Sequence, residues 1–167
     1  MAIRTYELSK DVSIHVHVCG EGGIFVNAYL VESARGVVAI DATLSESESK
    51  AFRREVEAIG KPLLAILITH PHPDHVGGIT NLVGRASVKI VCTQPVLDLM
   101  RKLEEPKRKQ WTPVFGAEWV QRWTRVVDLR GSSTGQNTYR LSQSDCWCRC
   151  CRTGFELCRL RKCNRTS

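Results

Sequence analysis

The sequence predicts a mixed α/β (α+β) fold, and two observations carry this prediction. Residues 37–40 and 63–68 are apolar runs of strand length, and residues 45–59 between them have the periodicity of an amphipathic helix. A strand, a helix and a strand in this order form a crossover unit whose two strands run parallel in one sheet. The second strand leads directly into a cluster of histidines, so polar side chains gather at the C-terminal edge of this sheet.

Two further strands are expected before the crossover unit. Residues 13–18 alternate between apolar side chains on one face and polar residues, including His15 and His17, on the other. These two histidines could form a pair of metal ligands. We favour the half-exposed face of a strand instead, because no other residues of ligand type cluster with them in the sequence. Residues 21–23 predict a turn, and residues 26–31 predict the next strand.

The crossover helix has start and stop signals at both ends. Ser45 and Glu48 fit a capping box at its N-terminus. Gly60 fits the position after its last turn, and Pro62 prevents its continuation. The expected buried stripe consists of Phe52, Val56 and Ile59.

Beyond the histidine cluster the helix and strand signals continue. Residues 79–83 predict a short helix and residues 88–93 another strand. Pro95 suits the first position of a further helix, which we expect to end before Pro106. The buried stripe of that helix would be Val96, Leu99, Met100 and Leu103.

Residues 107–129 begin with a charged run and are rich in aromatic side chains. Three interpretations are open: a lid over the histidine cluster, a long loop packed on the sheet, and a surface that stacks nucleic-acid bases. We favour the packed loop as the simplest of the three. The nucleic-acid surface is not favoured, because residues 1–129 carry only about one net charge between them. The aromatic residues are Trp111, Phe115, Trp119 and Trp123.

The segment that follows residues 63–68 concentrates the chemistry of the chain. His70 and His72 each precede a proline, which favours extended backbone, so their imidazoles point the same way and could bind one metal ion. Asp74 and His75 follow as the chain turns at two glycines, and they could serve a second ion nearby. Imidazole and carboxylate groups are ordinary zinc ligands, and paired ions can share an attacking water or hydroxide. The alternative is a histidine-rich surface loop.

This motif resembles the His-x-His-x-Asp-His signature of the metallo-β-lactamase-fold hydrolases, and the preceding Thr69 and the trailing Gly-Gly also match. The resemblance covers about residues 12–125. It implies an αββα sandwich made of two similar βα halves, of which this chain would supply only the first. It also implies one or two bound Zn²⁺ ions, with iron or manganese as alternatives. An uncovered sheet face would then favour a homodimer.

The resemblance also assigns roles to individual residues. His70 and His72 would hold the first ion, and Asp74 and His75 the second, with Asp74 orienting the nucleophilic water. Asp41 ends a buried strand, where an acid is either a turn former or a support for metal-bound histidines, which usually donate their second N–H to such a group. We favour support of the metal site from behind, as the resemblance implies.

The resemblance implies a metal-dependent hydrolase that acts on a small-molecule ester, thioester or amide through a metal-bound hydroxide. The family also has a third histidine, a bridging aspartate and a further histidine after the motif, whereas no histidine follows His75 here. We therefore expect catalysis by this chain to be impaired. The alternative function is a non-catalytic metal- or nucleic-acid-binding protein that uses the C-terminal segment, although nucleic-acid binding is not favoured.

The last part of the chain differs in composition from the rest. Residues 130–167 hold eight Lys or Arg residues against two acids, and six of the eight cysteines. We divide the chain into a partial domain at residues 1–129 and a basic Cys-rich tail at residues 130–167. The tail is disordered, or binds metal through its thiolates, or is foreign to the family, and we favour the last explanation. The sequence shows neither a secretory signal nor a membrane span, so we expect a cytoplasmic protein.

Overall fold

The computed structural model describes residues 3–84, 88–120 and 123. The chain divides into two units, residues 1–135 and residues 136–167, and only the first contains described residues. The predicted boundary after residue 129 and the predictions about the Cys-rich tail therefore lie outside the described residues. Everything below concerns the first unit.

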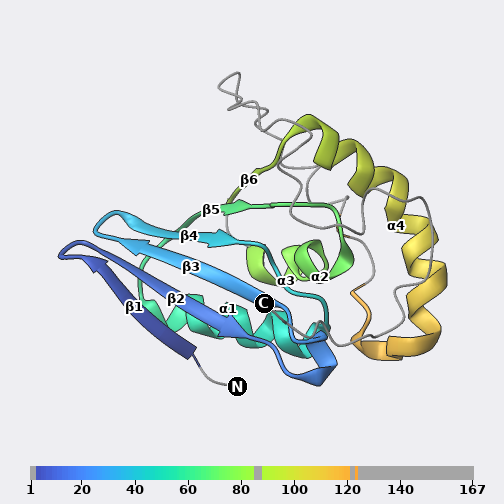
Figure 1. Ribbon diagram of the computed structural model, residues 1–167, viewed down its shortest axis with the longest axis horizontal. Coiled ribbons are helices and arrows are strands. Elements are labelled where there is room, and N and C mark those ends of the chain that lie inside the picture. The colour runs from blue at the N-terminus through green and yellow to red at the C-terminus, as the bar shows by residue number, and fades with distance from the viewer. Residues whose placement is uncertain (1–2, 85–87, 121–122, 124–167) are drawn as a thin grey trace, which may run out of the picture. The chain divides into compact units, whose positions relative to one another are not determined.

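One six-stranded sheet with the strand order β1-β2-β3-β4-β5-β6 forms the centre of this unit (Figure 1). The first four strands pair antiparallel, whereas β4 pairs with β5 and β5 with β6 in parallel. The predicted parallel pair around the crossover helix is thus confirmed. The strands are β1 (Ile3–Ser9), β2 (Val12–Val18), β3 (Asn27–Ser33), β4 (Gly36–Ile40), β5 (Leu63–Leu67) and β6 (Lys89–Val91).

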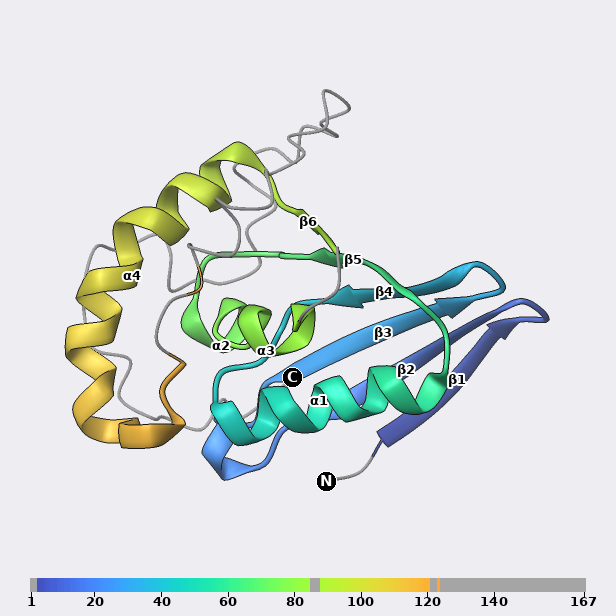
Figure 2. The same cartoon turned by 180° about the vertical axis from the view of Figure 1, so that it is seen from behind.

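The crossover helix and two short helices cover one face of the sheet (Figure 2). The helices are α1 (Glu46–Ile59), α2 (Pro73–Val76), α3 (Ile79–Val83) and α4 (Gln94–Phe115), with short 3₁₀ turns at η1 (Glu21–Gly23) and η2 (Gly116–Glu118). At the start of α1 the Ser45 hydroxyl accepts a hydrogen bond from the Glu48 N–H, and Gly60 ends the helix with a φ of 72°. The Glu48 carboxylate does not complete the capping box. It accepts a hydrogen bond from the Gly20 N–H instead.

The hydrophobic core lies between the sheet and these helices. Leu30, Ala39, Ile66 and Ile90 are register partners across four strands, and all four are buried. Full burial of one Leu or Ile side chain contributes about 1.5–3 kcal/mol. From the helices, the core receives Phe52, Val56, Val76, Ile79, Leu82, Val83, Leu97 and Met100.

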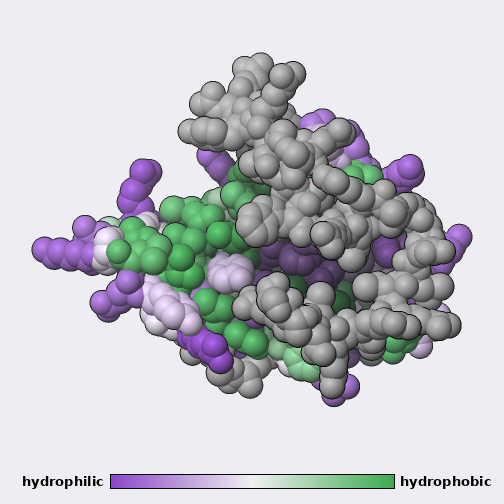
Figure 3. Space-filling model, in the orientation of Figure 1, coloured by the Kyte–Doolittle hydropathy of each residue, from purple (hydrophilic) through white to green (hydrophobic). Residues whose placement is uncertain are grey.

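The opposite face of the sheet carries a second set of apolar side chains that are only partly buried. Its rows cross the sheet in register, and Figure 3 shows hydrophobic surface gathered over these strands. Leu67 is 40% exposed and Tyr6 is 51% exposed. The partly buried members of these rows are Ile14, Val16, Tyr29, Val31, Val38, Ile40 and Ala65. The expectation of a homodimer through this face stays a prediction.

The structure differs from the predicted elements in two places. Strand β1 was missing from the prediction, and the predicted end of the last helix was wrong, because α4 does not end before Pro106 but continues through Pro106 and Pro113 to Phe115. Each proline removes one backbone hydrogen bond, yet α4 continues as a bent helix (Figure 1). Packing of Trp111 and Phe115 against the core accompanies this continuation. Packing of the aromatic segment was expected, but as a loop.

The remaining aromatic residues extend the same packing. Trp119 and Trp123 are buried. The ring centroids of Phe115 and Trp119 are 6.1 Å apart, and those of Trp119 and Trp123 are 5.8 Å apart. These side chains therefore belong to the hydrophobic core. Across the described ranges, no helix has the length and apolar character needed to cross a membrane.

Candidate metal centre

The histidine motif begins at His70, three residues after the end of β5, and runs into α2. His72 is the N-cap residue of α2 and has extended backbone angles of φ −73° and ψ 146°, in agreement with the effect expected of Pro73. Asp74 and His75 lie within this single turn of helix. The motif thus occupies the C-terminal edge of the parallel strands, where the sequence placed it.

Asp41 connects this motif to the neighbouring strand. It follows β4, and its backbone N–H donates to the carbonyl of Leu67 at the end of β5 (2.8 Å). Asp41 is buried, with 4% of its surface exposed. Its carboxylate accepts hydrogen bonds from the Thr69 N–H (2.9 Å) and the Thr69 hydroxyl (2.8 Å). It also lies 2.7 Å from Nδ1 of His75. Because a carboxylate only accepts, Nδ1 of His75 carries the proton in this contact.

The second nitrogen of His75 faces another carboxylate. Nε2 of His75 lies 3.2 Å from Oδ2 of Asp74. Burial lowers the pKa of His75, but hydrogen bonds to Asp41 and Asp74 outweigh it and raise this pKa to about 9. Burial raises the pKa of Asp74, but the hydrogen bond and charge of His75 outweigh it and hold this pKa below its usual value.

His70 and His72 complete the cluster. The rings of His70 and His75 have centroids 3.8 Å apart, and those of His70 and His72 lie 5.0 Å apart, edge to face. Nδ1 of His70 is 3.0 Å from the Thr69 hydroxyl. Burial and the neighbouring histidines lower the pKa of His70 to about 4. Burial also lowers the pKa of His72. Both imidazoles are therefore neutral at pH 7, the form in which imidazole binds metal ions.

The most compact set of ligand atoms in this cluster differs from the expected pairs. One atom each from Asp41, His70 and His75 lies within 4.8 Å of the other two, whereas His72 and Asp74 lie outside this set. The Asp41 oxygens already accept from Thr69 and His75, which suits a supporting carboxylate better than a ligand. Two ligands on one tetrahedral ion are ~3.4 Å apart, and the 3.2 Å between His75 and Asp74 fits this separation. The residues present therefore fit a metal ion.

The two glycines after the motif are needed because a side chain would not fit there, and not because the backbone adopts unusual angles. Gly77 and Gly78 have φ values of −54° and −78°, which any residue adopts. A Cβ on Gly78 would lie 2.0 Å from the carbonyl oxygen of Ala42, and one on Gly77 would lie 2.5 Å from that of Leu44. This close packing of α2 against the segment after β4 keeps Asp41 beside His75.

The interpretation of His17 as part of a half-exposed strand face is wrong. His17 is 1% exposed, and the alternation of residues 13–18 points it toward α1. Cys19 and Glu48 cluster with it, so ligand-type residues do gather there. Glu48 lies 31 positions further along the chain, and only the packing of α1 on the sheet brings it close. Sequence spacing alone carried no signal for this cluster.

Comparison with known proteins gives consistent matches. The family model of the metallo-beta-lactamase superfamily matches residues 22–132. The chain is 49% identical to the protein YobT of Bacillus subtilis over 57 residues, which are 34% of this chain and 24% of YobT. It is 30% identical to a metallo-beta-lactamase type 2 of Bacillus sp. (strain 170) over 105 residues, 60% of this chain and 40% of that protein.

A solved structure gives a similar picture of partial coverage. A metallo-beta-lactamase from Pontibacter korlensis aligns with a TM-score of 0.46 at 21% identity, over 60% of this chain and 48% of that one. The chain thus spans less than half the length of each of these relatives.

Proposed function

The chain belongs to the metallo-beta-lactamase superfamily, and from this membership we propose that it is a metal-dependent hydrolase that acts on an ester, thioester or amide bond. Members of this superfamily related to the chain are hydrolases. The observation that carries the proposal is the grouping of His70 and His75 with the Asp41 carboxylate, together with the contact of His75 with Asp74. We propose zinc as the metal.

In this proposal His70 and His72 hold a first ion, and Asp74 and His75 a second. A bound ion would supply a coordinated water with a pKa of about 7 and would polarise the substrate carbonyl. Asp41 accepts a hydrogen bond from Nδ1 of His75 and so directs Nε2 toward Asp74, where a bound ion would take the place of the Nε2 proton. Thr69 holds Asp41 through two donors and so fixes the position of that carboxylate. Asp74 would orient the attacking water.

We further propose that catalysis by the given sequence is weak. A catalytic zinc commonly has three protein ligands and one open position. No histidine follows His75 in this sequence, so a third imidazole for the first ion is lacking. Fewer ligands lower the affinity for the metal and orient the water less well. The small-molecule substrate and the cytoplasmic location stay predictions.

The test measures bound zinc per chain by elemental analysis and hydrolysis of a generic ester and a lactam. His72→Ala should reduce the bound metal, and His15→Ala is the matched control because His15 lies outside the motif and pairs with Glu32. Equal metal content in the two variants would refute the assignment of His72. Rapid turnover that is lost in His72→Ala would refute the proposed impairment. Metal that disappears only when the six tail cysteines are replaced by serine would favour the non-catalytic binding protein.

A further inference from the structure

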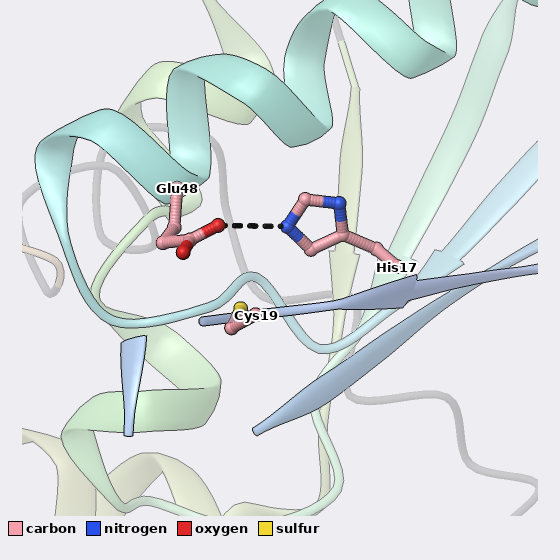
Figure 4. A group of neighbouring side chains, drawn as sticks. All are labelled: His17, Cys19 and Glu48. Atoms are coloured by element: carbon pink, nitrogen blue, oxygen red, sulfur yellow. Dashed lines mark ion pairs between the residues drawn. The ribbon is translucent and has the colours of Figure 1, made fainter. Parts of the chain in front are cut away.

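A second group of ligand-type side chains lies where β2 ends against the first turn of α1. A ring nitrogen of His17, Sγ of Cys19 and a carboxylate oxygen of Glu48 lie within 4.8 Å of one another. These residues are 1%, 1% and 6% exposed. Figure 4 shows them converging from β2, from the segment that follows it, and from α1. None of them belongs to the motif at residues 70–75.

His17 is oriented by a fourth residue, Glu55 of α1. Nδ1 of His17 lies 2.7 Å from Oε1 of Glu55, so this nitrogen carries a proton and donates it to the carboxylate. Nε2 of His17 then faces Oε2 of Glu48 at a distance of 3.3 Å. Neither of these two buried atoms has a hydrogen-bond partner among the described residues. A positive charge between these two atoms, either a proton on Nε2 or a bound metal ion, would pair them.

The same arrangement occurs in the candidate metal centre. There, His75 has its Nδ1 2.7 Å from one carboxylate, Asp41, and its Nε2 3.2 Å from another, Asp74. In both places one ring nitrogen of a histidine is hydrogen-bonded to one acid, and the other ring nitrogen lies beside a second acid. This is the usual arrangement of a metal-bound histidine, whose second N–H is donated to a carboxylate.

We propose that His17, Cys19 and Glu48 bind a divalent metal ion of the zinc type, at a site separate from the motif at residues 70–75. Two ligands on one tetrahedral zinc are ~3.4 Å apart, and the 3.3 Å between His17 and Glu48 matches this value. A thiolate, an imidazole and a carboxylate together favour zinc over magnesium or calcium, which prefer oxygen ligands.

Three contacts hold the site closed. The second oxygen of Glu48 accepts a hydrogen bond from the Gly20 N–H at 3.0 Å, which fixes the carboxylate toward His17. At Gly23 a Cβ would lie 2.6 Å from the Cβ of Cys19, so this backbone packs directly over the cysteine. The ring of Phe52 packs beside His17 with centroids 5.0 Å apart. An ion here would therefore join β2 to α1 in a dry environment and have a structural role.

The charges around Cys19 agree with this role. Burial and the carboxylates of Glu48 and Glu55 raise the pKa of the Cys19 thiol to about 12. In the metal-free chain the thiol is therefore protonated. Binding would form a bond from sulfur to the ion and release the thiol proton to solvent. The carboxylates that disfavour a bare thiolate attract a dication, and the dication in turn stabilises the thiolate.

The test uses Co²⁺ as the probe, because cobalt bound to a thiolate gives a charge-transfer absorption band. The background is the full chain with serine at the six cysteines of residues 146–163 and alanine at His70, His72 and His75, so that neither the tail nor the histidines of the motif contribute. We expect one cobalt per chain and a thiolate band. Cys19→Ser should abolish the band, and the matched control Cys92→Ser should leave it unchanged. Glu48→Gln should weaken cobalt binding at least tenfold.

Two controls keep the outcome decisive. Circular dichroism checks that each variant is folded, and zinc should raise the thermal midpoint of the background but not that of its Cys19→Ser form. If the background does not fold, the same comparison is made in the otherwise unaltered chain, where Cys19→Ser should bind one cobalt fewer than Cys92→Ser. Absence of a thiolate band from the folded background, or a band that persists in Cys19→Ser, would overturn the proposal. Equal cobalt content in the two variants of the unaltered chain would overturn it as well.

Discussion

Asp41→Asn tests the link between the metal ligands and the fold most directly. Asparagine has nearly the same shape and tolerates the positive φ of 63° at this position, so the backbone should be retained. The substitution replaces one acceptor oxygen by an NH₂ donor. The Asp41 carboxylate accepts from the Thr69 N–H, the Thr69 hydroxyl and Nδ1 of His75, so at least one of these contacts becomes a donor facing a donor.

The expected loss of metal affinity follows from these three contacts. If the amide of asparagine faces His75, Nδ1 must become an acceptor, and the proton of a neutral imidazole moves to Nε2, the nitrogen beside Asp74. Nε2 can then no longer bind a metal ion. One charge-assisted hydrogen bond is worth about 1.5–3 kcal/mol. Loss of such support for a ligand typically lowers metal affinity by about 10–100-fold, which corresponds to about 1.4–2.8 kcal/mol.

The assay is competition for zinc against a chromophoric chelator. It is carried out in the full chain with Cys19→Ser and with serine at the tail cysteines, so that the motif alone is measured. Asp98→Asn is the matched control, because Asp98 is exposed on α4, where its carboxylate accepts a hydrogen bond from the side chain of Gln94. An Asp41→Asn chain that stays folded and binds zinc as tightly as the Asp98→Asn chain would refute the reasoning.

Three further predictions concern the packing, charge and surface of the same unit. Gly78→Ala should destabilise the fold by about 1–3 kcal/mol in denaturant titrations, because its Cβ would lie 2.0 Å from a carbonyl oxygen. Gly22→Ala, whose Cβ meets nothing within 4 Å, should not show this steric loss. The hydrogen bond from Lys61 lowers the pKa of Glu32. Its stabilisation, less than about 1 kcal/mol for so exposed a pair, should be present above pH ~4.5 and disappear as the pH falls through the lowered pKa. Denaturation of Glu32→Gln and the unaltered chain should then differ at neutral pH and converge in acid. If the chain forms the predicted homodimer through the apolar sheet face, Leu67→Lys should shift sedimentation toward the monomer, and an unchanged distribution would contradict that interface.

The parts of the fold that could be predicted depend on local signals. The crossover helix has its own cap, stripe and stop residues, and α1 lies within one residue of the expected range. The motif at residues 70–75 was recognisable because its ligands are close in sequence and follow a buried strand. Its position at the edge of two parallel strands then placed Asp41 near it.

The parts that could not be predicted depend on contacts between distant segments. Pro106 is a strong local signal for the end of a helix, yet α4 continues past it while Trp111 and Phe115 pack on the core. The alternation of residues 13–18 showed that His17 differs in face from its apolar neighbours, but not which face would be covered. Only α1 lying across the sheet brings Glu48 and Glu55 to His17 and makes that face the buried one.

The two carboxylate–histidine groups therefore share one local geometry but differ in access to solvent. At the motif, the side chains of His75 and Asp74 are 17% and 24% exposed, so both side chains are in contact with solvent. At the second site, the side chains of His17 and Glu48 are 1% and 8% exposed, and Gly23 packs over the cysteine. An ion in the first position can take an open ligand site and support hydrolysis, because solvent supplies the nucleophile. An ion in the second position has no such access, so the same arrangement there can stabilise the fold but cannot serve catalysis.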